Sequence, residues 1–270
     1  MRYIKEFYRF LKHVVENRTL LFTLSYADFK EQHLGSYLGI FWAVIRPAVF
    51  IVVIWFIFSV GFRSKPTADD TPFILWLLCG FAPWFFFSEA LTKSMNAISS
   101  NAYLVKKVAF RVSILPLVKV LSALYLHIIF LFIVLSIFLF YGYTPNIYWL
   151  QIPYFISCTI MLVLGLGWLT SALRVFIKDI GEMVGIVVQF GFWLTPIFWS
   201  IDIIPEKYQT LIKLNPMFYI IDGYRNTLLN NTWFWLDGNT TVYFLTFTGI
   251  TLMVGAITFK RLRPHFGDVL

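Results

Sequence analysis

Residues 120–173 read "VLSALYLHIIFLFIVLSIFLFYGYTPNIYWLQIPYFISCTIMLVLGLGWLTSAL", a run without a single Lys, Arg, Asp or Glu. One helix needs about 20 apolar residues to cross a membrane, so this run is long enough for two crossings. The sequence "YGYTPN" at 141–146 supplies turn-forming residues near its middle. The stretch therefore predicts two antiparallel transmembrane helices. It excludes a membrane β-barrel, whose strands are short and alternate in polarity.

The rest of the chain has the same apolar character. Of its 270 residues, 59% are apolar and 13% are charged, which is about half the charged fraction of an average soluble domain. Further uncharged runs occupy residues 47–62, 71–88, 183–201 and 238–259. Extended as helices, they predict spans at about 37–62, 72–97, 183–200 and 240–260. We therefore expect an all-α integral membrane protein, a single domain with six transmembrane helices within residues 35–262.

The distribution of Lys and Arg predicts the orientation. Six spans place both termini on one side of the membrane, and sixteen Lys and Arg residues fall on that side against five on the other. Positively charged loops stay in the cytoplasm, so we expect a multi-pass protein with both termini cytoplasmic. Residues 3–15 carry apolar side chains on one helical face and basic ones elsewhere. Within a cytoplasmic segment 1–34, they predict an amphipathic helix lying at the inner membrane surface, or alternatively a packed cytoplasmic helix.

The segment 203–229 is too interrupted to cross the membrane as one helix. Proline is favoured at the first position of a helix, so Pro205 and Pro216 predict short helices at 205–214 and 216–229, broken at Asn215. Irregular backbone at membrane depth must be covered by protein or line a wet cavity. We therefore expect a re-entrant helix pair at the outer end that serves as a gate, the alternative being two interfacial helices lying flat. Asp222 and Arg225 are three residues apart, so they are expected to pair on one face, as a surface pair or a ligand site.

Arg46 lies inside the first predicted span. An arginine there costs at least about 2.5–3.5 kcal/mol on insertion scales, so it needs a partner or water. Glu89 in the second span is one candidate partner, although Glu89 is equally placed to pair with Lys93 four residues later. Arg46 thus marks either a wet pathway that meets phosphate or a structural ion pair.

Close helix packing is the ordinary explanation for the GxxxG pairs Gly35/Gly39 and Gly181/Gly185. Catalysis by this chain is not indicated. His127 is the one histidine in a predicted span, and no HExxH or Gly-x-Ser-x-Gly motif occurs, so we expect His127 to be a hydrogen-bonded packing residue. The chain contains no Gly-Lys dipeptide and therefore no P-loop, so any ATP must be bound by another chain.

Four stretches together resemble one known family. They are "DFKEQHLGSYLGIFW" (28–42), "NAYLVKKVAF" (101–110), "KDIGEMVGIVVQFGFWLTPIFW" (178–199) and "KLNPMFYIIDGYRNTLL" (213–229). Their order and spacing resemble the permease subunits of ABC exporters for cell-surface polysaccharides. Within that family, residues 54–86 look most like teichoic acid export permeases, with O-antigen and capsule permeases second.

The resemblance implies a homodimer with two cytoplasmic P-loop ATPase subunits that bind ATP and Mg²⁺, with no cofactor in this chain. The implied substrate is teichoic acid linked to undecaprenyl diphosphate, moved outward across the plasma membrane of a bacterium; no nucleic acid is expected. The alternatives are an ABC permease for O-antigen, capsular polysaccharide, another lipid or a drug, and less favoured, an integral membrane transferase or a passive channel.

The resemblance also assigns roles to residues. A substrate pathway between the subunits, along the first and fifth spans, is expected at Tyr37, Phe41, Trp42, Arg46, Gln189, Phe192 and Trp193. The outer gate is expected at Pro196, Pro205, Asn215, Pro216, Asp222 and Arg225. Contact with the ATPase is expected in 101–111 and 174–182, through Lys106, Lys107, Arg111, Lys178 and Asp179.

Overall fold

The computed structural model describes residues 16–33, 39–61, 71–105 and 112–270. Within these ranges every regular element is a helix, so the all-α prediction is confirmed. Residues 1–15 lie outside the described ranges, and the amphipathic helix expected at 3–15 is untested.

The uncharged run forms the predicted hairpin of α6 (Leu115–Phe140) and α7 (Ile152–Phe176). Both helices have proline in their first turn, where the missing N–H would have no helical partner. Between them, Gly142 takes a left-handed φ of +86° after the end of α6. Asn146 then caps a short 3-10 helix (Ile147–Gln151) by accepting from the Tyr148 N–H. Turn chemistry therefore divides the run where the sequence predicted.

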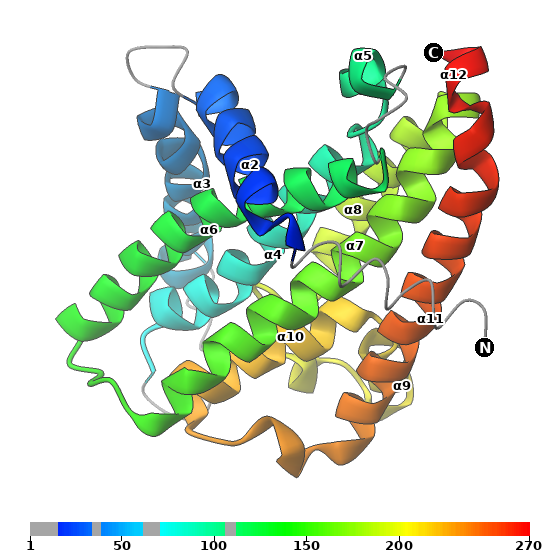
Figure 1. The fold of residues 1–270 in the computed structure, drawn as a ribbon. Helices are drawn as coiled ribbons and strands as arrows, with labels where there is room; N and C mark the ends of the chain where they lie inside the picture. Colours follow the sequence, from blue (N-terminus) through cyan, green and yellow to red (C-terminus); the bar gives the residue numbers. More distant parts are fainter. Residues whose placement is uncertain (1–15, 34–38, 62–70, 106–111) are drawn as a thin grey trace.

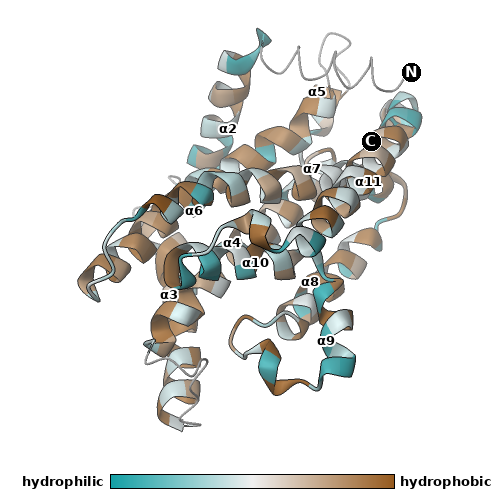
Figure 2. Ribbon diagram, turned by 90° about the horizontal axis from the view of Figure 1, so that it is seen from below, coloured by the Kyte–Doolittle hydropathy of each residue, from teal (hydrophilic) through white to brown (hydrophobic). Residues whose placement is uncertain are grey.

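Three more long helices have the apolar length of a membrane span. They are α3 (Gly39–Trp55), which continues as a π-helical segment (Phe56–Gly61), α4 (Phe73–Met95) and α11 (Gly238–Leu262). Together with α6 and α7, five helices of the described ranges are long and apolar enough to cross a membrane. Figure 2 shows how apolar residues dominate their ribbons.

The remaining predicted span, α8 (Ile180–Leu194), has 15 residues and ends earlier than the expected 183–200. Proline disfavours helical backbone in the residue before it, and Thr195 before Pro196 has an extended ψ of 137°. Residues 195–198 are buried although they are not helical. The helix at this position is thus about 22 Å long, and a covered non-helical segment continues from it.

α4 lies at the centre of the molecule, while α3 lies at its periphery. Within their most apolar windows, 78% of α4 is buried against 11% of α3. α4 packs against α6, α7 and the short helix α10 (Pro216–Arg225), and α7 packs along α11. Figure 1 shows α4 enclosed by these elements. The core therefore excludes most of α3 and α8, whose outward faces no other described segment covers.

α2 (Arg18–His33) crosses over α6. Its buried side chains Leu21, Ser25 and Phe29 recur every four residues, which places them on one helical face. Asp28 of α2 forms an ion pair of 2.5 Å with Lys119 of α6. This helix is therefore fixed to the bundle.

α2 ends, α3 begins and α4 ends at the same end of the bundle, where α5 (Ala102–Val105) and α12 (Phe266–Val269) also lie (Figure 1). We call this the inner end, because the charge distribution predicts it to be cytoplasmic. The opposite end, which carries α10 and the loop between α6 and α7, is called the outer end.

Candidate functional site

The broken segment at the outer end forms two short helices, as predicted. They are α9 (Glu206–Lys213) and α10, which a π-helical turn (Asn226–Asn230) extends. The break lies at Asn215, whose side chain accepts a hydrogen bond from the Met217 N–H while Pro216 occupies the first helical position. Pro205 precedes α9 directly. Proline and cap chemistry thus fix both helix starts.

Two other segments hold the break in place. The Asn215 side-chain amide donates to the Thr195 hydroxyl at 2.7 Å, just where α8 ends. The Tyr243 hydroxyl of α11 donates to the Leu214 carbonyl at 2.6 Å. The hinge between α9 and α10 is therefore joined to the end of α8 and to the start of α11.

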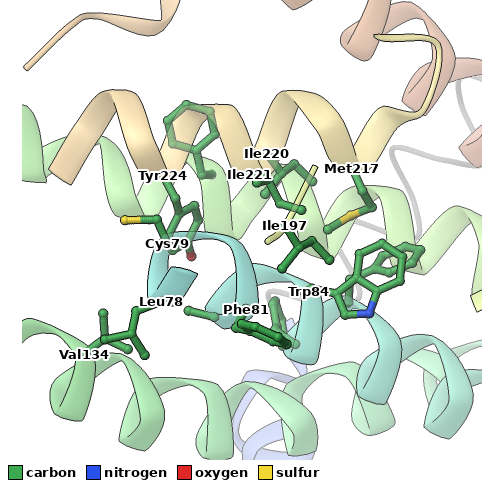
Figure 3. Packing of buried hydrophobic residues seen from close by; sticks show 14 of the residues in the cluster. Leu78, Cys79, Phe81, Trp84, Val134, Ile197, Met217, Ile220, Ile221 and Tyr224 are labelled. Carbon is green, nitrogen blue, oxygen red and sulfur yellow. The ribbon is translucent and has the colours of Figure 1, made fainter. Parts of the chain in front are cut away.

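α10 is covered on nearly every side, whereas α9 is exposed. Figure 3 shows Met217, Ile220, Ile221 and Tyr224 of α10 packed over α4. In α9, Leu211 is 68% exposed. Backbone at membrane depth needs the cover that α10 has, which suits a re-entrant helix better than one lying flat. The role of the pair as a gate stays a prediction.

Arg225 is buried, which corrects the expected surface pair with Asp222. Its guanidinium lies 3.5 Å from the ring centroid of Trp76 in α4, and its Nη2 donates to the Ile197 carbonyl at 2.9 Å. No ion pair within 4.0 Å joins it to Asp222, which accepts from the Asn226 amide instead. The spacing assumed a helix with a solvated face, but α10 is enclosed, so Arg225 reaches α4 and the 195–198 segment.

The Arg225 guanidinium has few partners for a buried charge. Its Nε has no hydrogen-bond partner among the described residues. A buried cation with one hydrogen bond and one stacking contact is costly to keep, which makes its contacts energetically important.

His127 is a packing residue, as predicted. Its ring stacks on Phe86 at 4.6 Å between centroids, and its Nε2 shares a 3.1 Å hydrogen bond with the Tyr224 hydroxyl. Tyr224 is fully enclosed at 1% exposure. The pair therefore connects α6 to α10 across the core.

The expected pathway residues spread along the length of two helices. Phe41, Trp42 and Trp193 are about half exposed, and Gln189 is exposed too. Phe192 instead turns inward, where its ring contacts Phe50 of α3 as well as Phe81 and Trp84 of α4. Tyr37 lies outside the described residues. The structure thus connects α3 to α8 through Phe192 and leaves the other aromatic rings on the outward faces.

Arg46 is exposed and lies in the inner half of α3. Glu89 had two candidate partners, Arg46 and Lys93, and it forms an ion pair of 2.5 Å with Lys93. The described residues offer Arg46 no ion pair or hydrogen bond. The structural ion pair with Glu89 considered from the sequence is therefore not formed.

Two of the expected coupling residues are described. Lys178 and Asp179 are exposed in the short link between α7 and α8 at the inner end. Lys106, Lys107 and Arg111 lie outside the described residues, after α5. Pro196, predicted in the gate, is buried beside Ile197.

Sequence reasoning missed the residues that contact Arg225 and the break at Asn215. Trp76, Thr195, Ile197 and Tyr243 contact Arg225 or the hinge from three different segments. Only the position of Thr195, just before a proline at the end of a span, gave a signal in the sequence. Within the described ranges, no three His, Cys, Asp or Glu side chains cluster closely enough to hold a metal.

Comparison with known proteins gives a consistent result over nearly the whole chain. The profile of the ABC-2 type transporter family matches residues 19–229. The O-antigen export system permease protein RfbA of Klebsiella pneumoniae is 31% identical over 254 residues, 93% of this chain and 95% of the relative. RfbA of Myxococcus xanthus is 25% identical over 219 residues, covering 80% and 83% of the two chains. The polysialic acid transport protein KpsM of Escherichia coli is 21% identical over 224 residues, covering 83% and 85%.

Proposed function

The chain belongs to the ABC-2 type transporter family, and on this premise we propose that it is the membrane subunit of an ATP-driven exporter of O-antigen or capsular polysaccharide. The observation that carries the proposal is the 31% identity to an O-antigen export permease across 93% of this chain. The relatives described above are named for O-antigen export and polysialic acid transport. Their names favour O-antigen or capsular polysaccharide, the alternative considered from the sequence, over teichoic acid.

The outward faces of α3 and α8 support a pathway between two copies of the chain. Phe41 and Trp42 on α3 and Phe190 and Trp193 on α8 are each about half exposed or more. Aromatic faces of this kind suit the apolar faces of sugar rings, and a second copy would cover the remaining apolar surface of both helices. In this proposal, the polymer passes along α3 and α8, and the α9–α10 pair closes the outer end.

The energy source belongs to partner subunits in this proposal. The chain has no Gly-Lys dipeptide and hence no P-loop of its own. Two cytoplasmic ATPases would contact the inner end at 101–111 and 174–182, where Lys178 and Asp179 are exposed. When the ATPases close on ATP, the movement would be transmitted to α7 and α8 through the link that joins these helices. In this proposal, the complex lies in the plasma membrane of a bacterium.

Deletion of the gene in its own host tests the substrate. We expect loss of polysaccharide from the cell surface and accumulation of the lipid-linked polymer inside, both reversed by the intact gene. Chemical analysis of the lost polymer separates the candidates, because a phosphate-rich polyol polymer would identify teichoic acid. Unchanged surface polymers would refute export of polysaccharide by this chain.

Purification of the tagged chain in mild detergent tests the partner. We expect a P-loop subunit to co-purify at about one per permease chain and the complex to hydrolyse ATP. Recovery of the chain alone, without hydrolysis, would contradict the ATP-driven mechanism and favour a passive channel.

A further inference from the structure

A cavity of about 610 Å³ opens in the inner half of the molecule, between α3, α4 and α6 beside the end of α2. Arg46 lines it from α3, and Glu89 and Lys93 line it from α4. Arg46 follows the start of the apolar part of α3 by five residues, which places it about 8 Å into the span. The cavity therefore lies in the half of the membrane nearest the inner end, and it is distinct from the outward aromatic faces of α8.

The charges around the cavity leave one cation free. Glu89 and Lys93 neutralise each other at 2.5 Å. His33, at the end of α2, has a pKa lowered by burial and by the charge of Lys93, and is therefore neutral at pH 7. His127 is hydrogen-bonded to Tyr224. Arg46 is left as the one charge lining the cavity that no described residue compensates.

The two hydroxyls beside Arg46 already donate within their own helix, and the charge of Lys93 is paired with Glu89. The Ser88 hydroxyl donates to the Phe85 carbonyl, and the Thr92 hydroxyl donates to the Ser88 carbonyl. Each satisfies its own helix. The guanidinium, with five N–H donors in a planar fork, is thus the strongest anion-binding group in the cavity.

Part of the cavity wall is apolar. Phe50 of α3, Phe85 of α4 and Phe130 of α6 line it, and the Phe85 and Phe130 rings meet edge to face at 6.0 Å between centroids. A cavity with one uncompensated cation and an aromatic wall suits a ligand with an anionic head and a hydrocarbon tail. A small hydrophilic anion would leave the aromatic wall without a partner.

We propose that this cavity binds the phosphate headgroup of a membrane lipid, with Arg46 bonded to the phosphate and the lipid chain lying along Phe50, Phe85 and Phe130. An arginine at this depth needs water or a counter-charge, and a bound phosphate supplies one. The lipid has two possible sources, a phospholipid of the bilayer or the isoprenyl carrier of the exported polymer. Only the second source rests on the proposed function.

Native mass spectrometry of the full-length permease, purified with the subunits that accompany it, tests the site. The probes are phosphatidylglycerol, a long-chain isoprenyl phosphate and, as a competitor, inorganic phosphate. We expect Arg46→Gln to weaken binding of the phosphate-headed lipid by about tenfold or more, since a hydrogen bond to a charged group is lost. Arg261→Gln, at the exposed inner end of α11, is the matched control and should leave binding unchanged.

The outcomes separate the sources and the proposals. Tighter binding of the isoprenyl phosphate than of phosphatidylglycerol assigns the site to the carrier of the polymer. Equal binding of the two lipids assigns the site to bilayer phospholipid. If inorganic phosphate alone displaces the bound lipid, the role of the lipid chain is overturned. Wild-type binding by Arg46→Gln would overturn the proposal. If that variant does not fold, Ala43→Phe, which places a ring in the cavity, must abolish binding for the proposal to stand. Because binding is measured without transport, its failure leaves the proposed export function intact.

Discussion

Arg225 is a buried cation whose partners come from two other parts of the chain. It stacks on Trp76 of α4 and donates to the carbonyl of Ile197 after α8. A hydrogen bond from a charged group contributes about 1.5–3 kcal/mol, and a desolvated cation over an aromatic ring about 2 kcal/mol. The residue therefore joins the proposed gate helix to the central helix and to the segment after α8.

Arg225→Met removes both contacts while retaining much of the side-chain volume. We expect the free energy of unfolding in detergent to fall by about 2–4 kcal/mol, measured as a lower midpoint of thermal unfolding. Arg261→Met is the control for loss of a positive charge, because Arg261 is exposed. An Arg225→Met protein as stable as the wild type would mean that the burial cost of the guanidinium cancels its contacts.

The Tyr224 hydroxyl forms a hydrogen bond with the His127 ring across the core. Tyr224→Phe keeps the aromatic packing but leaves the His127 Nε2 buried without this partner, which costs about 1–3 kcal/mol. We expect a corresponding drop in thermal stability, and a double-mutant cycle with His127→Phe should recover part of it. Tyr208→Phe, on the exposed α9, should change stability by no more than about 0.5 kcal/mol. Equal effects at 224 and 208 would contradict the coupling of α6 to α10.

At the scale of elements, glycines allow the close approach of α7 and α11. Of the predicted GxxxG positions, Gly39 faces the His33 backbone and Gly181 faces the Arg174 side chain, whereas a Cβ at Gly185 would meet no described atom within 4 Å. A Cβ at Gly255 of α11 would clash with the Gly165 carbonyl oxygen of α7, and one at Gly165 would lie 2.7 Å from the Leu252 nitrogen. Two helices approach this closely only where side chains are absent from both.

Gly255→Ala and Gly249→Ala form a matched pair within α11. Both raise helix propensity by about 1 kcal/mol, but only the first adds a methyl group against the backbone of α7. A Cβ at Gly249 meets no atom of the described residues within 4 Å. We expect Gly255→Ala to lower stability by about 1–3 kcal/mol and Gly249→Ala to leave it unchanged or raised, in thermal unfolding. Similar results for the two would show that α7 and α11 separate easily.

At the scale of the whole molecule, the helices packed around the central helix α4 differ from α3 and α8, which have exposed apolar faces. α6, α7 and α10 pack against it and α11 packs along α7, whereas α3 and α8 expose most of their apolar surface. The hinge at Asn215 sits where these parts meet, bonded to Thr195 at the end of α8. A movement of α8 would therefore act directly on the start of α10, as the proposed gate requires.

Cysteine accessibility tests that movement. Leu214→Cys lies at a position that is 50% exposed and Phe218→Cys at one that is 6% exposed, while the native Cys79 and Cys158 are buried. We expect an external thiol reagent to modify Cys at 214 at once and Cys at 218 only after the complex is trapped with ATP. Ile203→Cys, at 74% exposure, should react in both states and serves as the control. Protection at 218 in both states would make α10 a fixed structural helix and not a gate.

The sequence by itself determined the membrane class, the hairpin of α6 and α7, the positions of α3, α4 and α11, and the break at Asn215. These features depend on local chemistry: uncharged length, turn residues, and proline at helix starts. The sequence also favoured a polysaccharide export permease, and the comparisons establish the ABC-2 type transporter family. Teichoic acid, the polymer first favoured, is less supported than O-antigen. Local chemistry also explains why α8 ends at Thr195, although the prediction had carried the span to residue 200.

Only the tertiary structure decided which charges are paired and which helices are covered. Asp222 and Arg225 are correctly spaced for a pair, yet the enclosure of α10 turns Arg225 onto Trp76 and Ile197. From the sequence, Glu89 had two candidate partners, Arg46 in α3 and Lys93 in α4. In the packed structure Glu89 pairs with Lys93, and Arg46 faces the cavity. The spacing of residues along one helix predicts which side chains share a face. Segments distant in the chain determine what that face packs against, because burial is a property of the assembled fold.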